Sequence, residues 1–294
     1  MSRVLFSIPV HERPDIVRDQ IENIQHFCPN ATVCIHVSAA AAAQMRVFER
    51  YCDLPNVLVN PNSFETGLGT GILHTHVSNF EYSILQGVDF DKVVLLSSNE
   101  MLVKDGVGDF VSGYSHGAQT EVCDKSVDWH LFHSPVRDDV RVKGFLKKLG
   151  LPLFFGGQAE GQFFSKKDFS HIHRLYTEFF PMGPCGFVVE ELVPPTFGAY
   201  LCMTGKNAAQ PITVCDYCTN LPITEDVITQ VRSGIGSLFA MKIPRTLRSP
   251  HHGVSSLASI FSVKRVPRED CDLRRVIRGL WDVQPNDGQT AAGE

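Results

Sequence analysis

The sequence predicts an α/β fold with a mostly parallel central sheet, and three observations support this class. Short apolar segments rich in Val, Ile and Leu alternate with longer amphipathic segments through the first third of the 294-residue chain. The short segments are apolar on successive residues, as expected of strands buried on both faces. The composition, 43% hydrophobic and 20% charged residues, is typical of a protein with a sizeable core. Strands and helices in alternation favour a sheet covered by helices on both faces.

Four strands and three helices account for this first part of the chain. The strands are expected at residues 4–10, 31–37, 56–60 and 92–97. The first helix begins near Pro14, whose ring suits a first helical turn. The second is expected over residues 39–51, where an alanine run favours helix and Ser38 could cap the start. The third follows a glycine-containing loop at residues 64–71 and has apolar residues at helical spacing.

The second half of the chain is less regular. Short strands are expected at residues 151–155 and 162–164, and helices at 167–180 and 274–281. A helix start within residues 192–203 is expected to be broken by Pro194-Pro195. Because no repeat or linker divides the chain, the sequence predicts one domain over residues 1–285, with halves at 1–104 and 105–285, and a flexible polar tail at 286–294.

Charge, hydropathy and cysteine content exclude several classes of function. The net charge is −5 and no long basic run is present, so nucleic-acid binding is not expected. No apolar run is long enough for a membrane span, and the N-terminus shows no signal-peptide pattern, so a cytoplasmic location is expected. Nine cysteines without a regular framework favour reduced thiols. Cys215 and Cys218 form a lone CxxC pair, and two ordinary thiols are expected there rather than zinc ligands.

The strand-to-helix turns indicate where a ligand would bind. Residues 9–14 lack the GxGxxG pattern, which disfavours a dinucleotide site. Residues 67–71 contain three glycines but lack the Lys-Ser/Thr ending of a phosphate-binding loop, so an ordinary tight or flexible loop is expected. Ligands of open α/β sheets bind at the carboxyl ends of the strands. His11, at the end of the first strand, is therefore expected to line the ligand site, whereas His36 is expected to be structural.

Two adjacent carboxylates, Glu190 and Glu191, lie between an apolar run and Pro194-Pro195. Adjacent like charges in a pocket raise at least one pKa, which suits a general base that works near neutral pH. The alternative is that both carboxylates stabilise a helix N-terminus.

Basic residues gather late in the chain and predict a local anion site. The cluster comprises Lys242, Arg245, Arg248, Lys264, Arg265, Arg268, Arg274, Arg275 and Arg278. Side-chain cations of this kind can compensate the charge of a departing phosphate. Lys264 follows an apolar run and is the first candidate, followed by Arg248, Arg245 and Arg265. The alternative is a solvated basic face.

Scattered motifs, in a shared order, resemble the core-2/I-branching N-acetylglucosaminyltransferase and peptide xylosyltransferase family. The motifs are Ile8-Pro9-Val10-His11, Pro29-Asn30, Cys34-Ile35-His36-Val37, Gly161-Gln162-Phe163-Phe164-Ser165, Glu190-Glu191 with Thr196, and Phe261-Ser262-Val263-Lys264. The chain has Ser38 where the family has an aspartate, and Ser98-Asn99-Glu100 where other enzymes of this fold carry a metal-binding Asp-x-Asp.

The resemblance implies a GT-A fold, with a nucleotide-binding half at 1–104 and an acceptor half at 105–285. It implies that Glu191 is the base, with Glu190 as its neighbour, and that Lys264 binds the diphosphate. The remaining predictions are Pro9, Val10, His11, Arg245, Arg248 and Arg265 for the nucleotide, and Asn99, Glu100, Gln162, Phe163 and Glu190 itself for the sugars.

The sequence thus leads to the hypothesis of an inverting, metal-independent glycosyltransferase without a cofactor. Its partners would be a UDP-sugar of the N-acetylhexosamine or xylose class and a carbohydrate acceptor, as in biosynthesis of a bacterial surface polysaccharide. Three alternatives stay open: a non-catalytic nucleotide- or sugar-binding protein on the same fold, a nucleotidyltransferase with a GT-A-like fold, and a metal-dependent transferase that uses Glu100.

Overall fold

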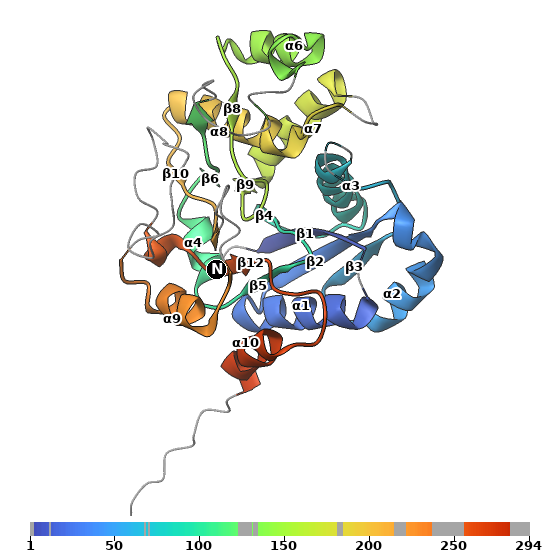
Figure 1. Ribbon diagram of the computed structural model, residues 1–294. Helices are drawn as coiled ribbons and strands as arrows, with labels where there is room; N and C mark the ends of the chain where they lie inside the picture. The colour runs from blue at the N-terminus through green and yellow to red at the C-terminus, as the bar shows by residue number, and fades with distance from the viewer. Residues whose placement is uncertain are drawn as a thin grey trace, which may run out of the picture.

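The protein is described here by a computed structural model (Figure 1). The structure describes residues 3–11, 13–67, 69, 71–122, 131, 135–180, 185–214, 222–236 and 256–282. The predicted tail at 286–294, Cys215, Cys218, Arg245 and Arg248 lie outside these residues. Within the described part of the chain, no helix combines the length and hydrophobicity that crossing a bilayer requires.

The described residues form a central sheet of seven strands in the order β10-β6-β9-β4-β1-β2-β3. Its strands are β1 (Val4–Val10), β2 (Ala31–Val37), β3 (Val57–Asn60), β4 (Lys92–Leu95), β6 (His116–Gly117), β9 (Phe163–Ser165) and β10 (Ala208–Ala209). Neighbouring pairs among β3, β2, β1 and β4 are parallel, as are β6 and β10, whereas β9 is antiparallel to both β4 and β6. The predicted α/β class with a mostly parallel sheet is confirmed.

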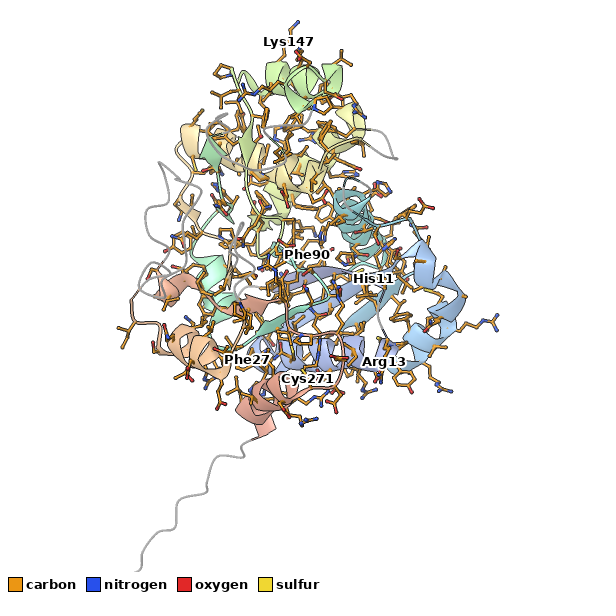
Figure 2. All side chains as sticks on the ribbon, viewed as in Figure 1. His11, Arg13, Phe27, Phe90, Lys147 and Cys271 are labelled. Atoms are coloured by element: carbon orange, nitrogen blue, oxygen red, sulfur yellow. The ribbon has the colours of Figure 1, made fainter. Side chains whose placement is uncertain are left out.

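Helices cover both faces of this sheet, which explains why its strands are apolar throughout. Successive side chains of a strand point to opposite faces. Leu5 belongs to the core beneath α3 (Ile72–Leu85), and Phe6 belongs to the core beneath α1 (Pro14–Phe27). Figure 1 shows α1 and α3 on opposite sides of β1 and β2. Figure 2 shows Phe90 within the molecule, where it is buried in the core beneath α3, whereas Lys147 projects outward from α6 (Val140–Leu149).

The remaining elements lie outside the central sheet, most of them in the second half of the chain. They are η1 (Ala39–Gln44), α2 (Met45–Tyr51), α4 (Val107–Ser112), β7 (Glu121–Val122), η2 (Pro135–Arg137), α6 (Val140–Leu149), β8 (Phe155–Gly156), α7 (Lys166–Phe179), η3 (Val189–Glu191), α8 (Val193–Met203), α9 (Glu225–Ser233), η4 (Leu257–Ser259) and α10 (Asp272–Asp282). A small sheet orders β11 (Thr213–Val214), β12 (Ser262–Lys264) and β5 (Glu100–Leu102) side by side. Antiparallel pairing of β12 with β5 sets Lys264 opposite Glu100. Lys264, late in the sequence, therefore lies close to the end of β4.

Two helix predictions need correction. The expected helix over residues 39–51 is a 3₁₀ turn followed by α2, and the Ser38 side chain does not cap it. Instead, the Ser38 hydroxyl accepts a hydrogen bond from Thr66, and the amide of Ala39 donates to the carbonyl of Phe64. Pro194-Pro195 does not break α8 either. These prolines occupy its first turn, where a helix has no acceptor for the missing N–H groups.

Gly71→Ala is expected to destabilise the protein by about 2–4 kcal/mol, more than Gly87→Ala. Both glycines have left-handed backbone conformations, with φ near +72° and +70°. A Cβ on Gly71 would lie 2.0 Å from the carbonyl oxygen of Glu65, whereas one on Gly87 would meet nothing within 4 Å. Urea unfolding measures both changes. Equal losses in the two variants would show that the Glu65 contact adds nothing to the backbone strain.

Candidate functional site

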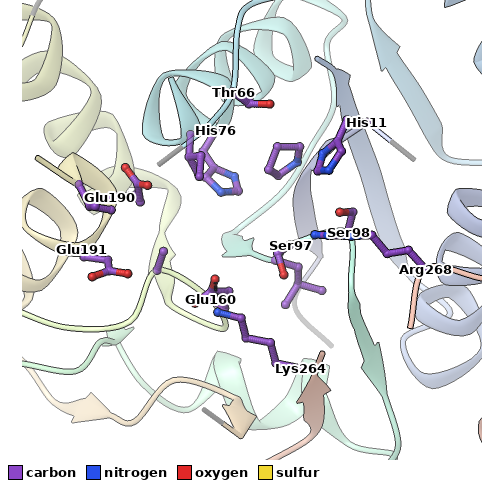
Figure 3. A pocket seen from close by; sticks show the side chains of 16 residues that line it. His11, Thr66, His76, Ser97, Ser98, Glu160, Glu190, Glu191, Lys264 and Arg268 are labelled. Carbon is purple, nitrogen blue, oxygen red and sulfur yellow. Dashed lines mark ion pairs between the residues drawn. The ribbon is translucent and has the colours of Figure 1, made fainter. Parts of the chain in front are cut away.

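A pocket of about 320 Å³ lies at the carboxyl ends of β1 and β4 (Figure 3). Chain connections leave in opposite directions from these two strands, which makes this edge the switch point where open α/β sheets bind ligands. The wall is formed by Pro9, His11, Thr66, Gly67, Ile72, His76, Leu96, Ser97, Ser98, Ala159, Glu160, Val188, Glu190, Glu191, Lys264 and Arg268. Segments that are far apart in the sequence therefore contribute to one cavity.

The acid pair lies on one wall, in the short turn η3 that precedes α8. Glu190 is only 4% exposed. Burial raises the pKa of Glu190 to about 8, the charges of Glu191 and Glu160 add to the rise, and a backbone hydrogen bond opposes it. The carbonyl of Glu191 accepts a hydrogen bond from the amide of Gly157, which ties η3 to the chain after β8. Near neutral pH, Glu190 is therefore largely protonated beside Glu191.

A cationic wall faces this acid pair. Lys264, at the end of β12, lines the pocket, and its Nζ lies 2.5 Å from Oε1 of Glu160. Both side chains of this pair are about one-fifth exposed, at 19% and 18%. Arg268 lines the pocket from the segment that follows β12. Figure 3 shows Glu190 and Glu191 across the cavity from Arg268, with the Lys264–Glu160 pair between them.

Glu100, for which we predicted a sugar contact or, as an alternative, a metal-binding role, lies outside the pocket wall. The side chain is 0% exposed. Its Oε1 accepts hydrogen bonds from the amide and the hydroxyl of Ser97, and its Oε2 accepts one from Thr213. Burial raises the pKa of Glu100 to about 8, and the charge of Glu160 adds to the rise. The carboxyl group thus fixes the turn between β4 and β5.

Several other predicted site residues do not reach the cavity. Phe163 is 0% exposed and packs against Phe110 in the core, so it has no free face for a sugar. Gln162 is equally buried, and its amide donates to the carbonyl of Gln158. Val10 points into the core beneath α1. Asn99 and Arg265 are absent from the wall. Arg265 has a left-handed backbone conformation, and Arg268, three residues later, lines the pocket.

Of the predicted residues, the structure brings Pro9, His11, Glu190, Glu191 and Lys264 together in the pocket. The functional roles predicted for them stay predictions. His36 is fully buried, and its Nε2 accepts a hydrogen bond from the amide of Phe64, as a structural histidine does.

The wall also holds three ionisable side chains that were not predicted to belong to the site, those of Arg268, His76 and Glu160. Arg268 belongs to the late cluster of basic residues, so the sequence did carry a signal for it. His76 follows His74 by two residues on α3, a spacing that turns the two rings to different sides of the helix and does not indicate a metal site. Glu160 is a single carboxylate in a loop, and nothing in the local sequence marks it.

The described residues contain no group of three or more His, Cys, Asp or Glu side chains placed to bind a metal ion together.

No protein-family model and no curated protein matches this sequence. Among solved structures, a nucleoside-diphosphate-sugar pyrophosphorylase from Vibrio cholerae RC9 aligns with 70% of this chain and 90% of its own length, at 9% identity and a TM-score of 0.42. The mannosyltransferase PcManGT from Pyrobaculum calidifontis, in complex with GDP-Man and Mn²⁺, aligns over 71% of this chain and 55% of its own, at 14% identity and a TM-score of 0.37. The galactosyltransferase LgtC, in complex with donor and acceptor sugar analogs, aligns over 97% and 98%, at 12% identity and a TM-score of 0.37. Likenesses this distant say nothing about the donor, acceptor or mechanism of this chain.

Glu190→Gln is expected to weaken the pH dependence of stability. The pKa of about 8 lies above the ordinary 4.5, so between these values the folded protein keeps a proton that the unfolded chain has released. Stability therefore falls as the pH rises through this window. A glutamine stays neutral, so the variant should gain stability over the native protein at pH 8 and differ little below pH 4.5.

Urea unfolding at a series of pH values measures this difference. The variant is expected to keep part of the pH dependence of stability, because Glu100 has a similarly raised pKa. Glu178→Gln, at a half-exposed side chain on α7, is the matched control and should leave the profile unchanged. A constant difference between Glu190→Gln and the native protein at all pH values would contradict a titrating Glu190.

Proposed function

We propose that this chain is an inverting glycosyltransferase that moves a sugar from a UDP-sugar, of the N-acetylhexosamine or xylose class, to a carbohydrate hydroxyl group. One observation carries the proposal. A single pocket at the carboxyl ends of β1 and β4 holds the acid pair Glu190–Glu191 on one wall and the cations Lys264 and Arg268 on another. These are the groups that the reaction needs at its two ends.

In this reaction, the acceptor oxygen forms a bond to the anomeric carbon of the donor sugar while the bond from that carbon to the phosphate oxygen breaks. The electron pair of the broken bond leaves with UDP, and the proton of the acceptor hydroxyl goes to the carboxylate of Glu191. The transition state resembles an oxocarbenium ion, as in glycoside hydrolysis. A positioned carboxylate contributes by accepting the proton as the new bond forms.

The departing diphosphate develops negative charge, which Lys264 and Arg268 would stabilise through charge-assisted hydrogen bonds. The ion pair of Lys264 with Glu160 holds the ammonium group at the cavity and keeps it partly neutralised. A bound diphosphate would therefore share this lysine with Glu160. His11 and Pro9 line the same cavity and are the residues we propose for the nucleotide. Arg245 and Arg248 stay candidates for the diphosphate as well.

Thermal unfolding with UDP, GDP and CMP, each with and without EDTA, tests the donor class. A ligand at a hundred times its Kd stabilises the folded state by about 2.7 kcal/mol, which raises the melting temperature. We expect UDP to stabilise the protein selectively and EDTA to leave the shift unchanged. A shift with GDP or CMP alone would overturn the UDP assignment. UDP binding without sugar transfer to any acceptor would favour the non-catalytic alternative.

A metal-dependent enzyme that uses Glu100 is not favoured. Both oxygens of this buried carboxyl group already accept hydrogen bonds, from Ser97 and Thr213. A shift with UDP that disappears in EDTA would nevertheless require a metal ion held by other residues.

A further inference from the structure

One polar wall residue, His76, has no part in the reaction described above. It lies on α3, is 3% exposed and lines the pocket. Figure 3 shows its ring between Glu190 and His11, directed toward the cavity. A histidine buried at a pocket wall has two nitrogens with different uses, and which nitrogen holds the proton depends on the partner of the other.

A chain of buried hydrogen bonds behind His76 fixes that choice. It starts at the backbone amide of Asn62, which can only donate and does so to Oδ1 of Asn60, at 3.0 Å. Nδ2 of Asn60 then donates to Oδ1 of Asn79, also at 3.0 Å. Nδ2 of Asn79 therefore carries the donors, and it donates to the carbonyl of Cys34 at 3.0 Å and to Oγ of Ser7 at 3.1 Å. The carbonyl of Cys34 can only accept. The two ends of this series of hydrogen bonds therefore require the same orientation of the Asn60 and Asn79 side-chain amides.

The hydroxyl group of Ser7 connects Asn79 to His76, because it accepts a hydrogen bond from the first and can donate one to the second. Ser7 is 0% exposed, and its Oγ lies 2.8 Å from Nδ1 of His76. One lone pair of Ser7 Oγ already accepts a hydrogen bond from Asn79. Among the described residues, Nδ1 of His76 is the acceptor within reach of the Ser7 hydroxyl hydrogen. A buried hydroxyl hydrogen without an acceptor is costly, so Ser7 donates and Nδ1 accepts. The imidazole proton is then on Nε2.

Burial also keeps this imidazole uncharged. Burial and, to a smaller extent, the charge of the nearby His36 together lower the pKa of His76 to about 3. The ring is therefore a fixed, neutral donor at any pH where the protein works. A neutral N–H group suits a sugar hydroxyl or carbonyl oxygen, whereas Lys264 and Arg268 supply the charge that phosphate requires. His76 also lies next to the acid pair, where the reacting sugar would be.

We propose that His76 is a sugar-recognition residue, held by Ser7 and Asn79 as the Nε2–H tautomer, and that it donates this hydrogen bond to an oxygen of the transferred sugar. The assignment of the ligand rests on the proposed glycosyltransferase function. The assignment of the tautomer does not, because it follows from the hydrogen-bond chain alone.

The tautomer is measured first, by ¹H–¹⁵N correlation NMR of the histidine rings in the protein without ligand, with His76→Gln used to identify the signal. We expect a protonated Nε2 and an unprotonated Nδ1 at neutral pH. A proton on Nδ1 would overturn the proposal, whatever the protein binds. In Ser7→Ala, which removes the donor to Nδ1, the proportion of the Nε2–H tautomer should fall.

Binding of UDP and of UDP-N-acetylglucosamine is then compared by calorimetry. His76→Phe is expected to weaken UDP-N-acetylglucosamine about tenfold and to leave UDP unchanged, because one neutral hydrogen bond is lost. His76→Gln, whose amide can place a donor near the position of Nε2, should retain most of the affinity. His173→Phe, at a histidine on α7 that pairs with Glu81 outside the pocket, is the matched control.

Equal losses for both ligands in His76→Phe would overturn recognition of the sugar and would assign the residue to the nucleotide. No binding of UDP or UDP-N-acetylglucosamine by the native protein would remove the sugar assignment together with the proposed function. The NMR result would still decide the tautomer in that case, so the two failures are distinguishable.

Discussion

Glu191→Gln is expected to reduce sugar transfer by about 10²- to 10⁴-fold while UDP affinity changes little. Glutamine has nearly the same shape as glutamate but cannot accept the acceptor's proton. The nucleotide would be held by residues on other walls of the pocket, with Lys264 and Arg268 at its diphosphate. The loss should therefore appear in kcat, with the Kd for UDP and the melting temperature close to the native values.

Two companion variants make this test specific. Glu178→Gln changes a half-exposed carboxylate that pairs with Lys148 on the surface, so transfer should be unaffected. Lys264→Met should weaken UDP binding itself, because it removes a charge next to the proposed diphosphate. Transfer by Glu191→Gln at the native rate would eliminate this residue as the base. If Glu190→Gln abolished transfer and Glu191→Gln did not, the base would be reassigned to Glu190.

The sequence was a good guide to the sheet because burial acts on every residue of its strands. β1 and β2 lie in the sheet's interior with helices on both faces, so Val4–Val10 and Ala31–Val37 are apolar almost throughout. The same logic places ligands at the strand ends, which is why His11 and Pro9 are found in the pocket. Glu190, Glu191 and Lys264 reach it as well, but they were predicted from adjacent charges, a late basic cluster and the resemblance of short motifs, and not from periodicity.

Two of the predicted sugar contacts lie away from the pocket for one physical reason. Phe163 and Gln162 were assigned by motif position, but β9 lies between β4 and β6 in the middle of the sheet, where side chains on either face are covered. Conversely, Glu160 lines the pocket and pairs there with Lys264, which β12 brings to it from about a hundred residues further along the chain. Such pairings depend on tertiary structure, and no local pattern in the sequence encodes them.

Asp19→Ala is expected to destabilise the protein by about 3–5 kcal/mol, because it leaves a buried charge without its partner. Asp19 lies on α1 and is 5% exposed. Its Oδ2 accepts a hydrogen bond from Arg274 at 2.6 Å, and its Oδ1 accepts one from Arg278. Arg274 is 0% exposed, so water cannot replace the lost carboxylate. Urea unfolding measures the loss, and Asp138→Ala, at a 94% exposed side chain paired with Lys143, is a control that should change stability little.

The same ion pair connects stability to the pocket. Nε of Arg274 donates to the carbonyl of Pro267 at 2.6 Å, which fixes the segment that carries Arg268 to the wall. Asp19→Ala should therefore weaken UDP binding in addition to stability, although Asp19 is not a wall residue. The double variant Asp19→Ala, Arg274→Met leaves no unpaired charge at position 274 and should recover part of the stability, since apolar replacements of buried ion pairs are often tolerated. A double variant no more stable than Asp19→Ala would show that the cost comes from lost packing on α1 and not from the uncompensated arginine.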